Sequence, residues 1–208
     1  MPNPKRPARS AASPRPYHHG NLRRALLDEA LVTIAAEGVD AVTLREIGAR
    51  VGVSRTALYR HFADKRALLA AVATEGFRTL RERLVGSRED GNRRGGGFGA
   101  MGVAYVQFAL DNPSHYRVMF GPFVDREFQD PELATEAHGA FQALVDALVA
   151  QQEAGNVRRD DPLQMASYVW AVVHGLAMLA IDGKLPEPVN IDVLTQYALD
   201  RLLTGIAR

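Results

Sequence analysis

The sequence has no cysteine among its 208 residues, which excludes disulfide bonds, zinc sites built from thiolates and thiol-based redox sensing. The motifs of common catalytic sites are also missing. No serine lies in a G-x-S-x-G turn, and no two of the six histidines have the i, i+4 spacing of a zinc-binding helix. The glycine-rich stretch RRGGGFG lacks the preceding strand of a phosphate-binding loop. We therefore predict no catalytic residue, no metal site, no cofactor and no enzymatic activity.

Long hydrophobic runs are scarce as well. The one candidate membrane segment, 165–181, is seventeen residues long and has no Asp, Glu, Lys or Arg, and His174 is its one basic side chain. As a helix it would span ~25 Å at ~1.5 Å per residue, less than the ~30 Å hydrocarbon core of a bilayer. We expect instead a helix buried on all sides, in part against a second subunit, in a cytoplasmic protein.

Charge is unevenly distributed, although the net charge is only +1. Residues 1–66 contain twelve Lys or Arg and six Asp or Glu, a net of +6, whereas residues 67–208 have a net of −5. The basic front is therefore the part expected to approach nucleic acid. Its first sixteen residues combine basic side chains with several prolines and no apolar run, which predicts a disordered basic tail over 1–16 rather than a secretory signal. Such a tail is either solvated or a minor-groove DNA arm.

The most informative segment is 43–65, TLREIGARVGVSRTALYRHFADK, which has the pattern of two short helices around a Gly-Val turn. Thr43 and Glu46 form a T-x-x-E capping box, which marks a helix start, and apolar residues then recur at helical spacing. Gly52 suits the left-handed conformation that ends such a helix. Ser54 is placed to cap a second helix whose outward positions are charged, polar or aromatic. This is the layout of a helix-turn-helix, whose second helix lies in the major groove of DNA.

Basic residues occupy positions where they oppose the helix dipole. Arg55 falls in the first turn of the second helix, and Lys65 and Arg66 open the next helix after an Asp64 cap. A cation at such a position costs about 0.3–1 kcal/mol, a cost that nearby DNA phosphates would offset. The alternative is that these long side chains extend into solvent and lose most of the penalty.

Residues 17–79 resemble the N-terminal DNA-binding domain of TetR/AcrR-type transcriptional regulators, through LRRALLDEALVTIAAEGVDAVT followed by TLREIGARVGVSRTALYRHFADKRALL. The segment WAVVHG at 170–175 is similar to the W-x-x-x-H-G signature of one subgroup, which HHGNLR and HYRVMF also fit. The resemblance implies a homodimer with three N-terminal helices for DNA and further helices for ligand binding and dimerisation. It also implies that Thr43, Tyr59 and Lys65 contact phosphates.

The second helix and its surroundings supply the candidate DNA contacts. Arg55 is suited to a bidentate contact with guanine, since its planar fork matches O6 and N7. Thr56 would contact a thymine methyl or a phosphate. Tyr59 could instead pack against the turn, and His61 could have a structural role in the fold, as its neighbour Phe62 does. The predicted set is Thr43, Arg45, Ser54, Arg55, Thr56, Tyr59, Arg60, His61 and Lys65.

The rest of the chain predicts helices, with proline, glycine or asparagine at each boundary. We expect an all-α fold of about nine helices, with a helix-turn-helix DNA-binding domain over 17–64 and a ligand-sensing and dimerisation domain over 65–208. The glycine-rich stretch 86–99 predicts a flexible loop. Outside the helix-turn-helix, helices are predicted at 21–36, 65–85, 98–111, 113–120, 131–155, 162–182 and 192–204.

The downstream half is rich in aromatic and thioether side chains and poor in charge, a composition that suits an adaptable apolar pocket. Trp170, His174 and Met178 share one helix face, where an indole and an imidazole would orient a ligand by hydrogen bonds. Each of these side chains could equally belong to an ordinary core. The candidate ligand-binding set is Met101, Tyr105, Phe108, Tyr116, Phe120, Phe141, Trp170, His174 and Met178.

Together these features predict a transcriptional regulator, expected to be a repressor. Helix-turn-helix proteins bind palindromic sites as dimers, and the last two long helices offer apolar surface for a homodimer. A small, mostly apolar effector would release the operator by binding the DNA-incompetent state more tightly. Two alternatives are a ligand-independent DNA-binding protein and a small-molecule-binding protein with a vestigial helix-turn-helix.

Overall fold

The computed structural model describes residues 22–93, 96–124 and 130–207. Over these ranges the chain forms nine α-helices and no strand, which confirms the predicted all-α class. The predicted basic tail over 1–16 and most of the HHGNLR motif lie outside the described residues.

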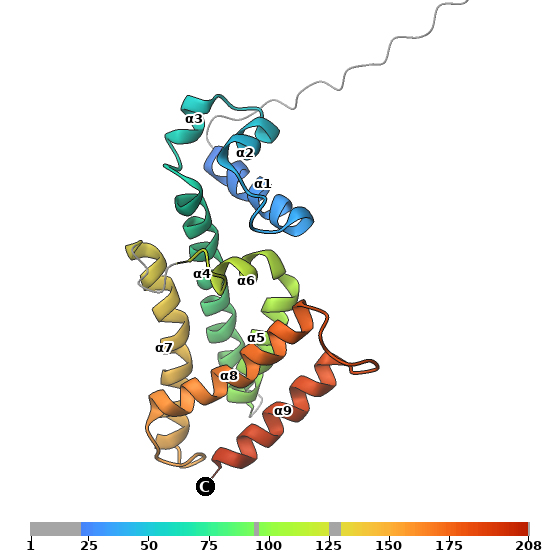
Figure 1. Ribbon diagram of the computed structural model, residues 1–208. Coiled ribbons are helices and arrows are strands. Elements are labelled where there is room, and N and C mark those ends of the chain that lie inside the picture. Colours follow the sequence, from blue (N-terminus) through green and yellow to red (C-terminus); the bar gives the residue numbers. More distant parts are fainter. Residues whose placement is uncertain (1–21, 94–95, 125–129, 208) are drawn as a thin grey trace, which may run out of the picture.

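The first three helices gather at one end of the molecule, against the start of the long helix α4 (Figure 1). They are α1 (Leu22–Glu37), α2 (Leu44–Val51) and α3 (Arg55–Tyr59), and α4 covers Lys65–Asn92. Apolar side chains from all four helices and the turn before α4 form their shared core, in which the best buried are Leu26, Ile34, Ile47, Leu58, Phe62, Leu68 and Leu69.

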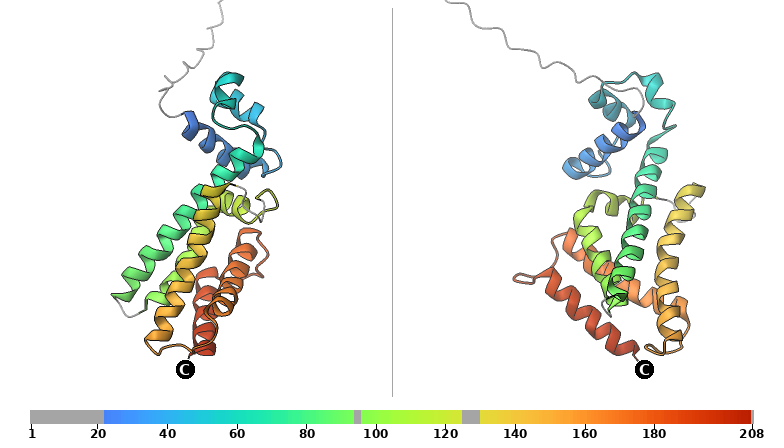
Figure 2. Two further views of the ribbon diagram at one scale, coloured as in Figure 1. Left: turned by 90° about the vertical axis from the view of Figure 1, so that its left-hand side faces the viewer. Right: turned by 180° about the vertical axis from the view of Figure 1, so that it is seen from behind.

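The remaining helices surround the lower part of α4. Figure 2 shows α7 (Pro131–Glu153) running beside α4 in the same direction, with α8 (Pro162–Ile181) and α9 (Ile191–Ile206) lying together on another side. Helices α5 (Gly97–Asp111) and α6 (Pro113–Met119) complete the body, and α6 lies just below α1. α4 is therefore the one helix that belongs to both ends of the molecule.

Short polar residues fix where the later helices begin. The side chain of Asp130 accepts hydrogen bonds from backbone N–H groups at the start of α7, Asp161 does so for α8, and Asn190 does so for α9. Each satisfies donors that a helix leaves unpaired at its first turn. Proline occupies the first position of α6, α7 and α8, where its missing N–H costs nothing.

The structure differs from the prediction in the glycine-rich stretch. α4 continues to Asn92 instead of ending at residue 85, and α5 begins at Gly97, so the predicted flexible loop over 86–99 is wrong for the residues described there. Packing outweighs the helix cost of glycine, which is about 1 kcal/mol per residue. A Cβ on Gly91 would lie 2.7 Å from the Cα of Gly97, so the missing side chains let α4 and α5 approach closely.

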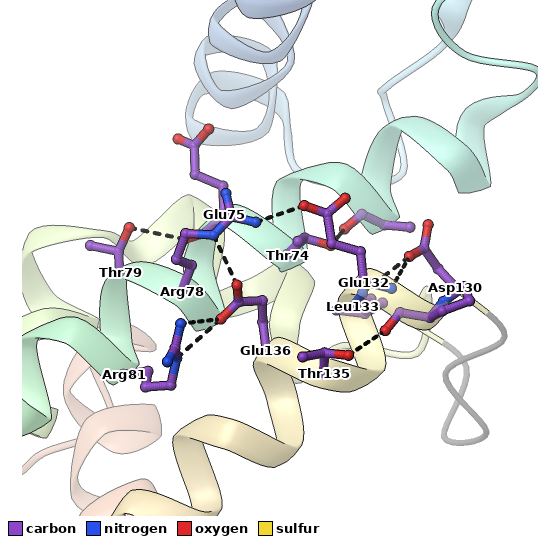
Figure 3. A network of polar contacts seen from close by, with 12 residues as sticks. Thr74, Glu75, Arg78, Thr79, Arg81, Asp130, Glu132, Leu133, Thr135 and Glu136 are labelled. Carbon is purple, nitrogen blue, oxygen red and sulfur yellow. Dashed lines mark hydrogen bonds and ion pairs between the residues drawn. The ribbon is translucent and has the colours of Figure 1, made fainter.

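Two arginines of α4 converge on one carboxylate of α7 (Figure 3). Arg78 Nε donates to Glu136 Oε1 at 2.9 Å, and Arg81 Nε donates to Glu136 Oε2 at 3.1 Å. Arg78 also donates to Glu132 Oε1 at 2.7 Å. Both hydrogen bonds raise the pKa of the Arg78 guanidinium, and the bond to Glu136 has the larger effect. Because Glu136 is only 9% exposed, the network holds α7 against α4 through a largely buried charge.

Replacing Glu136 with alanine should lower the free energy of unfolding by about 1–3 kcal/mol, because two arginines lose a charge-assisted acceptor. Glu132→Ala is the matched control: it removes a second partner of Arg78 whose side chain is 63% exposed, and it should cost under about 1 kcal/mol. Urea unfolding followed by circular dichroism measures both. Equal losses in the two variants would contradict a specific role for the buried carboxylate.

Candidate nucleic-acid interface and ligand cavity

The helix-turn-helix has the local geometry that its sequence predicts. Thr43 Oγ1 accepts from the Glu46 N–H at 3.2 Å and also donates to Glu46 Oε2 at 2.9 Å, so Thr43 caps the start of α2. Gly52 ends α2 with φ 77°, a left-handed conformation that favours glycine. Ser54 Oγ then accepts from the Ala57 N–H at 3.2 Å and caps α3. Local chemistry thus fixes the turn that positions α3.

One side of α3 is buried and the other faces solvent. Leu58 is only 2% exposed and packs into the core. The outward residues carry donors and one aromatic ring, and the guanidinium of Arg55 lies 5.6 Å from the ring centre of Tyr59, which is 45% exposed. The predicted contacts that the structure places on or beside this exposed face are Arg55, Thr56, Tyr59, Arg60 and His61.

The predicted contacts outside α3 occupy varied positions. Thr43 and Ser54 are exposed, but their hydroxyls already serve as helix caps. Arg45 is exposed on α2. Lys65 is partly buried: its Nζ donates to the backbone oxygen of Asp40 at 3.0 Å and lies 5.3 Å from the centre of the Phe123 ring. A phosphate contact by Lys65 would therefore compete with contacts inside the protein.

A large cavity lies among helices α4 to α9. It has a volume of about 960 Å³, near the upper end of the range of small-molecule sites. Its walls come from α4 to α9 and from the segment after α6, and they are mostly aliphatic, aromatic or thioether. The lining residues are Phe77, Leu80, Leu84, Phe98, Met101, Gly102, Tyr105, Met119, Phe120, Gly121, Pro122, Val124, Ala137, His138, Ala140, Phe141, Leu144, Val169, Trp170, Val173, His174 and Leu199.

A cluster of polar side chains lies at one wall of this cavity. The indole N–H of Trp170 donates to the Tyr105 hydroxyl oxygen at 3.0 Å, and that oxygen lies 2.9 Å from the Tyr116 hydroxyl oxygen. His174 Nδ1 lies 2.7 Å from the Tyr116 oxygen and 3.2 Å from the Tyr105 oxygen. The Tyr116 and His174 rings are stacked with centroids 5.6 Å apart. The cluster joins α5, α6 and α8.

Comparison with known proteins identifies the family in which this helix-turn-helix domain and this cavity occur together. Residues 26–72 match the family described as "Bacterial regulatory proteins, tetR family". Residues 98–202, about half of the chain, match "Tetracyclin repressor-like, C-terminal domain". The chain belongs to the TetR family.

Individual relatives agree with the family assignment. An HTH-type transcriptional repressor of Mycobacterium tuberculosis is 30% identical over 175 residues, which cover 82% of this chain and 88% of the relative. The solved structure of a Rhodococcus sp. RHA1 protein of unknown function has a TM-score of 0.82 and 32% identity, over 94% of this chain and 100% of that chain. A TetR family transcriptional regulator of Thermus thermophilus, with a TM-score of 0.68 and 18% identity over 88% and 99% of the two chains, shares the fold. These matches confirm a DNA-binding transcriptional regulator rather than an enzyme.

The cavity of this TetR-family chain includes six of the nine predicted ligand-binding residues: Met101, Tyr105, Phe120, Phe141, Trp170 and His174. Three others do not line it. Tyr116 is fully buried behind His174 and contributes through its hydroxyl. Phe108 is fully buried with the Arg83 guanidinium 5.9 Å from its ring centre, and Met178 lies one turn beyond His174 on α8, past the lining.

The lining residues that the sequence did not predict come mainly from α7, with Ala137, His138, Ala140 and Leu144, and from α4. Phe77, Leu80 and Leu84 recur at helical spacing on that helix and line the cavity. Their periodicity indicates a buried face, but no local signal distinguishes a cavity wall from a filled core.

Burial keeps the polar cluster of the TetR-family cavity uncharged. Desolvation raises the pKa of Tyr105 to about 12, although the hydrogen bonds with Tyr116 and Trp170 act to lower it. Desolvation also raises the pKa of Tyr116. Desolvation also lowers the pKa of His174 from its usual value of 6.5. At neutral pH the two hydroxyls are therefore protonated and the imidazole is neutral.

The last two helices expose an apolar face. Its largest side chains, between 45% and 68% exposed, are Tyr168 and Leu179 on α8 and Val193 and Tyr197 on α9. By length and composition alone, α8 would also suit a membrane span. One such helix is weak evidence of a membrane span, and the chain belongs to a family of DNA-binding regulators. Exposed apolar patches of this kind more often mark protein contacts.

Removing the hydroxyl of Tyr116 tests whether the polar cluster stabilises the protein. Tyr116→Phe should lower the free energy of unfolding by about 1 kcal/mol, because a fully buried hydrogen-bond partner of His174 is lost. Tyr59→Phe removes the same group from a side chain that is 45% exposed on α3, away from α8 and α9, and should change stability by less than about 0.5 kcal/mol. Denaturant unfolding of both variants is the measurement. An unchanged Tyr116→Phe protein would mean that the cluster contributes nothing.

Proposed function

We propose that this TetR-family protein is a homodimeric, ligand-responsive repressor that binds a palindromic operator and is released by a small, mostly apolar effector. The observation that carries the proposal is that one helix, α4, packs in the core of the helix-turn-helix domain and also lines a cavity of about 960 Å³. Occupancy of the cavity would therefore bias the position of the DNA-binding end.

DNA recognition would follow from the exposed face of α3. Inserted in the major groove, Arg55 would contact guanine O6 and N7, and Thr56 would contact a thymine methyl or a phosphate. Exposed donors around the turn, including Arg45 and Arg60, would bind phosphates and set the orientation. The net charge of +6 over residues 1–66 favours this approach.

Dimerisation would use the exposed apolar face of α8 and α9. Leu179 and Val193 are 45% and 68% exposed, large values for aliphatic side chains in a protein of this size. Pairing of these helices with their copies would form a four-helix bundle and bury the face. A symmetric dimer would place two α3 helices for the two halves of a palindrome.

Two contact chains connect the cavity with the DNA-binding end. Pro122 and Val124 line the cavity, and Phe123 between them lies against Lys65 at the start of α4. In addition, Glu75 of α4 accepts from Arg24 Nη1 of α1 at 2.7 Å and lies 3.3 Å from His115 Nε2 of α6. A ligand that shifts the residues after α6 would therefore act on α1 and α4 together.

The proposal is tested first by selecting bound sequences from a random duplex library with the purified protein. Enrichment of a two-fold symmetric site is expected. Arg55→Ala should then weaken binding by roughly 1–3 kcal/mol for each half-site and relax discrimination at one base pair in each half. Arg159→Ala, a change of an exposed arginine between α7 and α8, is the control and should bind as the wild type does. Intact discrimination in Arg55→Ala would show that another residue contacts the base.

Lys65→Ala should behave differently, because a phosphate contact carries no sequence information. Binding to every duplex should weaken together, and the slope of log affinity against log salt should become shallower by about 1 for each subunit, or about 2 for the dimer. Lys184→Ala, a change of the same residue type between α8 and α9, should leave the slope unchanged. A wild-type slope in Lys65→Ala would mean that its contacts with Asp40 and Phe123 persist on DNA.

A further inference from the structure

The cavity is neutral over the residues described. Among the described residues that line it, only Tyr105, His138, Trp170 and His174 have polar side chains, and none is Lys, Arg, Asp or Glu. An ionised ligand group would be desolvated there without a partner of opposite charge, which is costly. The composition of the wall therefore favours an uncharged ligand, and the polar cluster determines which hydrogen bond is offered to it.

The protons of the polar cluster can be counted. The two tyrosine oxygens and His174 Nδ1 form a triangle with separations of 2.9, 2.7 and 3.2 Å. The Trp170 N–H can only donate, and it donates to the Tyr105 oxygen. The triangle must therefore accommodate two hydroxyl protons, together with a third proton if Nδ1 is the protonated imidazole nitrogen.

The count favours one tautomer of His174. When Nδ1 is unprotonated, both hydroxyl protons find an acceptor within the triangle. When Nδ1 carries the proton it cannot accept, and one hydroxyl proton of Tyr105 or Tyr116 is left without a partner. Those residues are only 6% and 0% exposed, so an unpaired hydroxyl there is unfavourable. The proton of the neutral imidazole therefore belongs on Nε2.

His174 Nε2 is then the available donor. It makes no hydrogen bond to any described residue, and the one side-chain polar atom in those residues that is both fully buried and unpartnered is Thr195 Oγ1, so Nε2 is accessible. The Nδ1 side of the ring is occupied by the hydroxyls of Tyr116 and Tyr105, and His174 itself lines the cavity. The opposite nitrogen consequently points toward the space that a ligand would fill.

We infer that the cavity binds neutral, mainly apolar molecules that carry a carbonyl oxygen, which accepts a hydrogen bond from His174 Nε2–H. Ketones, esters and lactones belong to this class, whereas hydrocarbons lack the acceptor and carboxylates bring a charge that the wall does not balance. Tyr116 is a positioning residue, since it fixes the tautomer without touching the ligand. The inference rests on the proposed ligand-responsive function and specifies its effector class.

The chain provides its own probe for a binding test. Trp170 is the single tryptophan of the sequence and lines the cavity, so its fluorescence reports occupancy. The purified protein is titrated with 2-decanone, decane and decanoate at pH 7.5, and the two neutral probes are compared at equal fractions of their aqueous solubility to remove the difference in hydrophobic transfer. At least tenfold preference for 2-decanone over both others is expected.

Two phenylalanine variants assign the preference to one residue. His174→Phe should still bind decane but lose the advantage of the ketone. His138→Phe, the change of the other histidine in the lining, should keep it. Equal binding of decane and 2-decanone by the wild type, or a persistent ketone preference in His174→Phe, would overturn the carbonyl assignment and leave the repressor proposal standing. Failure of all three probes to bind would overturn both.

A measurement on the unmodified protein covers the case in which His174→Phe does not fold. Imidazole ¹⁵N chemical shifts of the ligand-free wild type, with His174 assigned through its backbone, distinguish the two neutral tautomers. A protonated Nε2 and an unprotonated Nδ1 are expected, and Tyr116→Phe should increase the fraction with the proton on Nδ1. A wild-type proton on Nδ1 would contradict the inference.

Discussion

The structure depends on the packing of a single helix that both ends of the molecule share. Near its start, Leu68 and Leu69 of α4 are at most 1% exposed and belong to the same core as α1 to α3. Two to three turns further on, Phe77 and Leu80 line the cavity. Because a helix transmits displacement along its axis with little bending, the two ends cannot be repositioned independently.

Close packing limits how the surrounding helices can move. A Cβ on Gly76 would lie 2.4 Å from Met119 Sδ, so α4 and α6 touch where a side chain would not fit. On the opposite side, the carboxylate of Glu136 holds α7 to Arg78 and Arg81. Buried charge of this kind adds less stability than its geometry suggests, but it penalises any arrangement that breaks it. The part of the cavity wall made by α6 and the residues after it is therefore the part best placed to couple ligand binding to the position of the DNA-binding helices.

Much of this organisation could be predicted from the sequence. The cap at Thr43, the turn at Gly52 and the caps at Ser54 and Asp64 are local signals, and each has the predicted geometry. The end of α4 could not be predicted, because close approach to Gly97 outweighs the propensity of glycine. The cavity was only partly predictable: an aromatic composition indicates apolar surface, but which side chains line a space depends on tertiary packing.

The central claim is that the cavity and the DNA-binding face are coupled. Linkage requires that a ligand which releases the operator also binds the operator-bound protein more weakly, by the same factor. The most direct measurement is a Trp170 fluorescence titration with 2-decanone, on the free protein and on the protein saturated with its selected duplex. We predict an affinity about 5- to 150-fold lower for the DNA complex, the usual range of such coupling. Identical affinities would show that the sites are independent and would contradict the account.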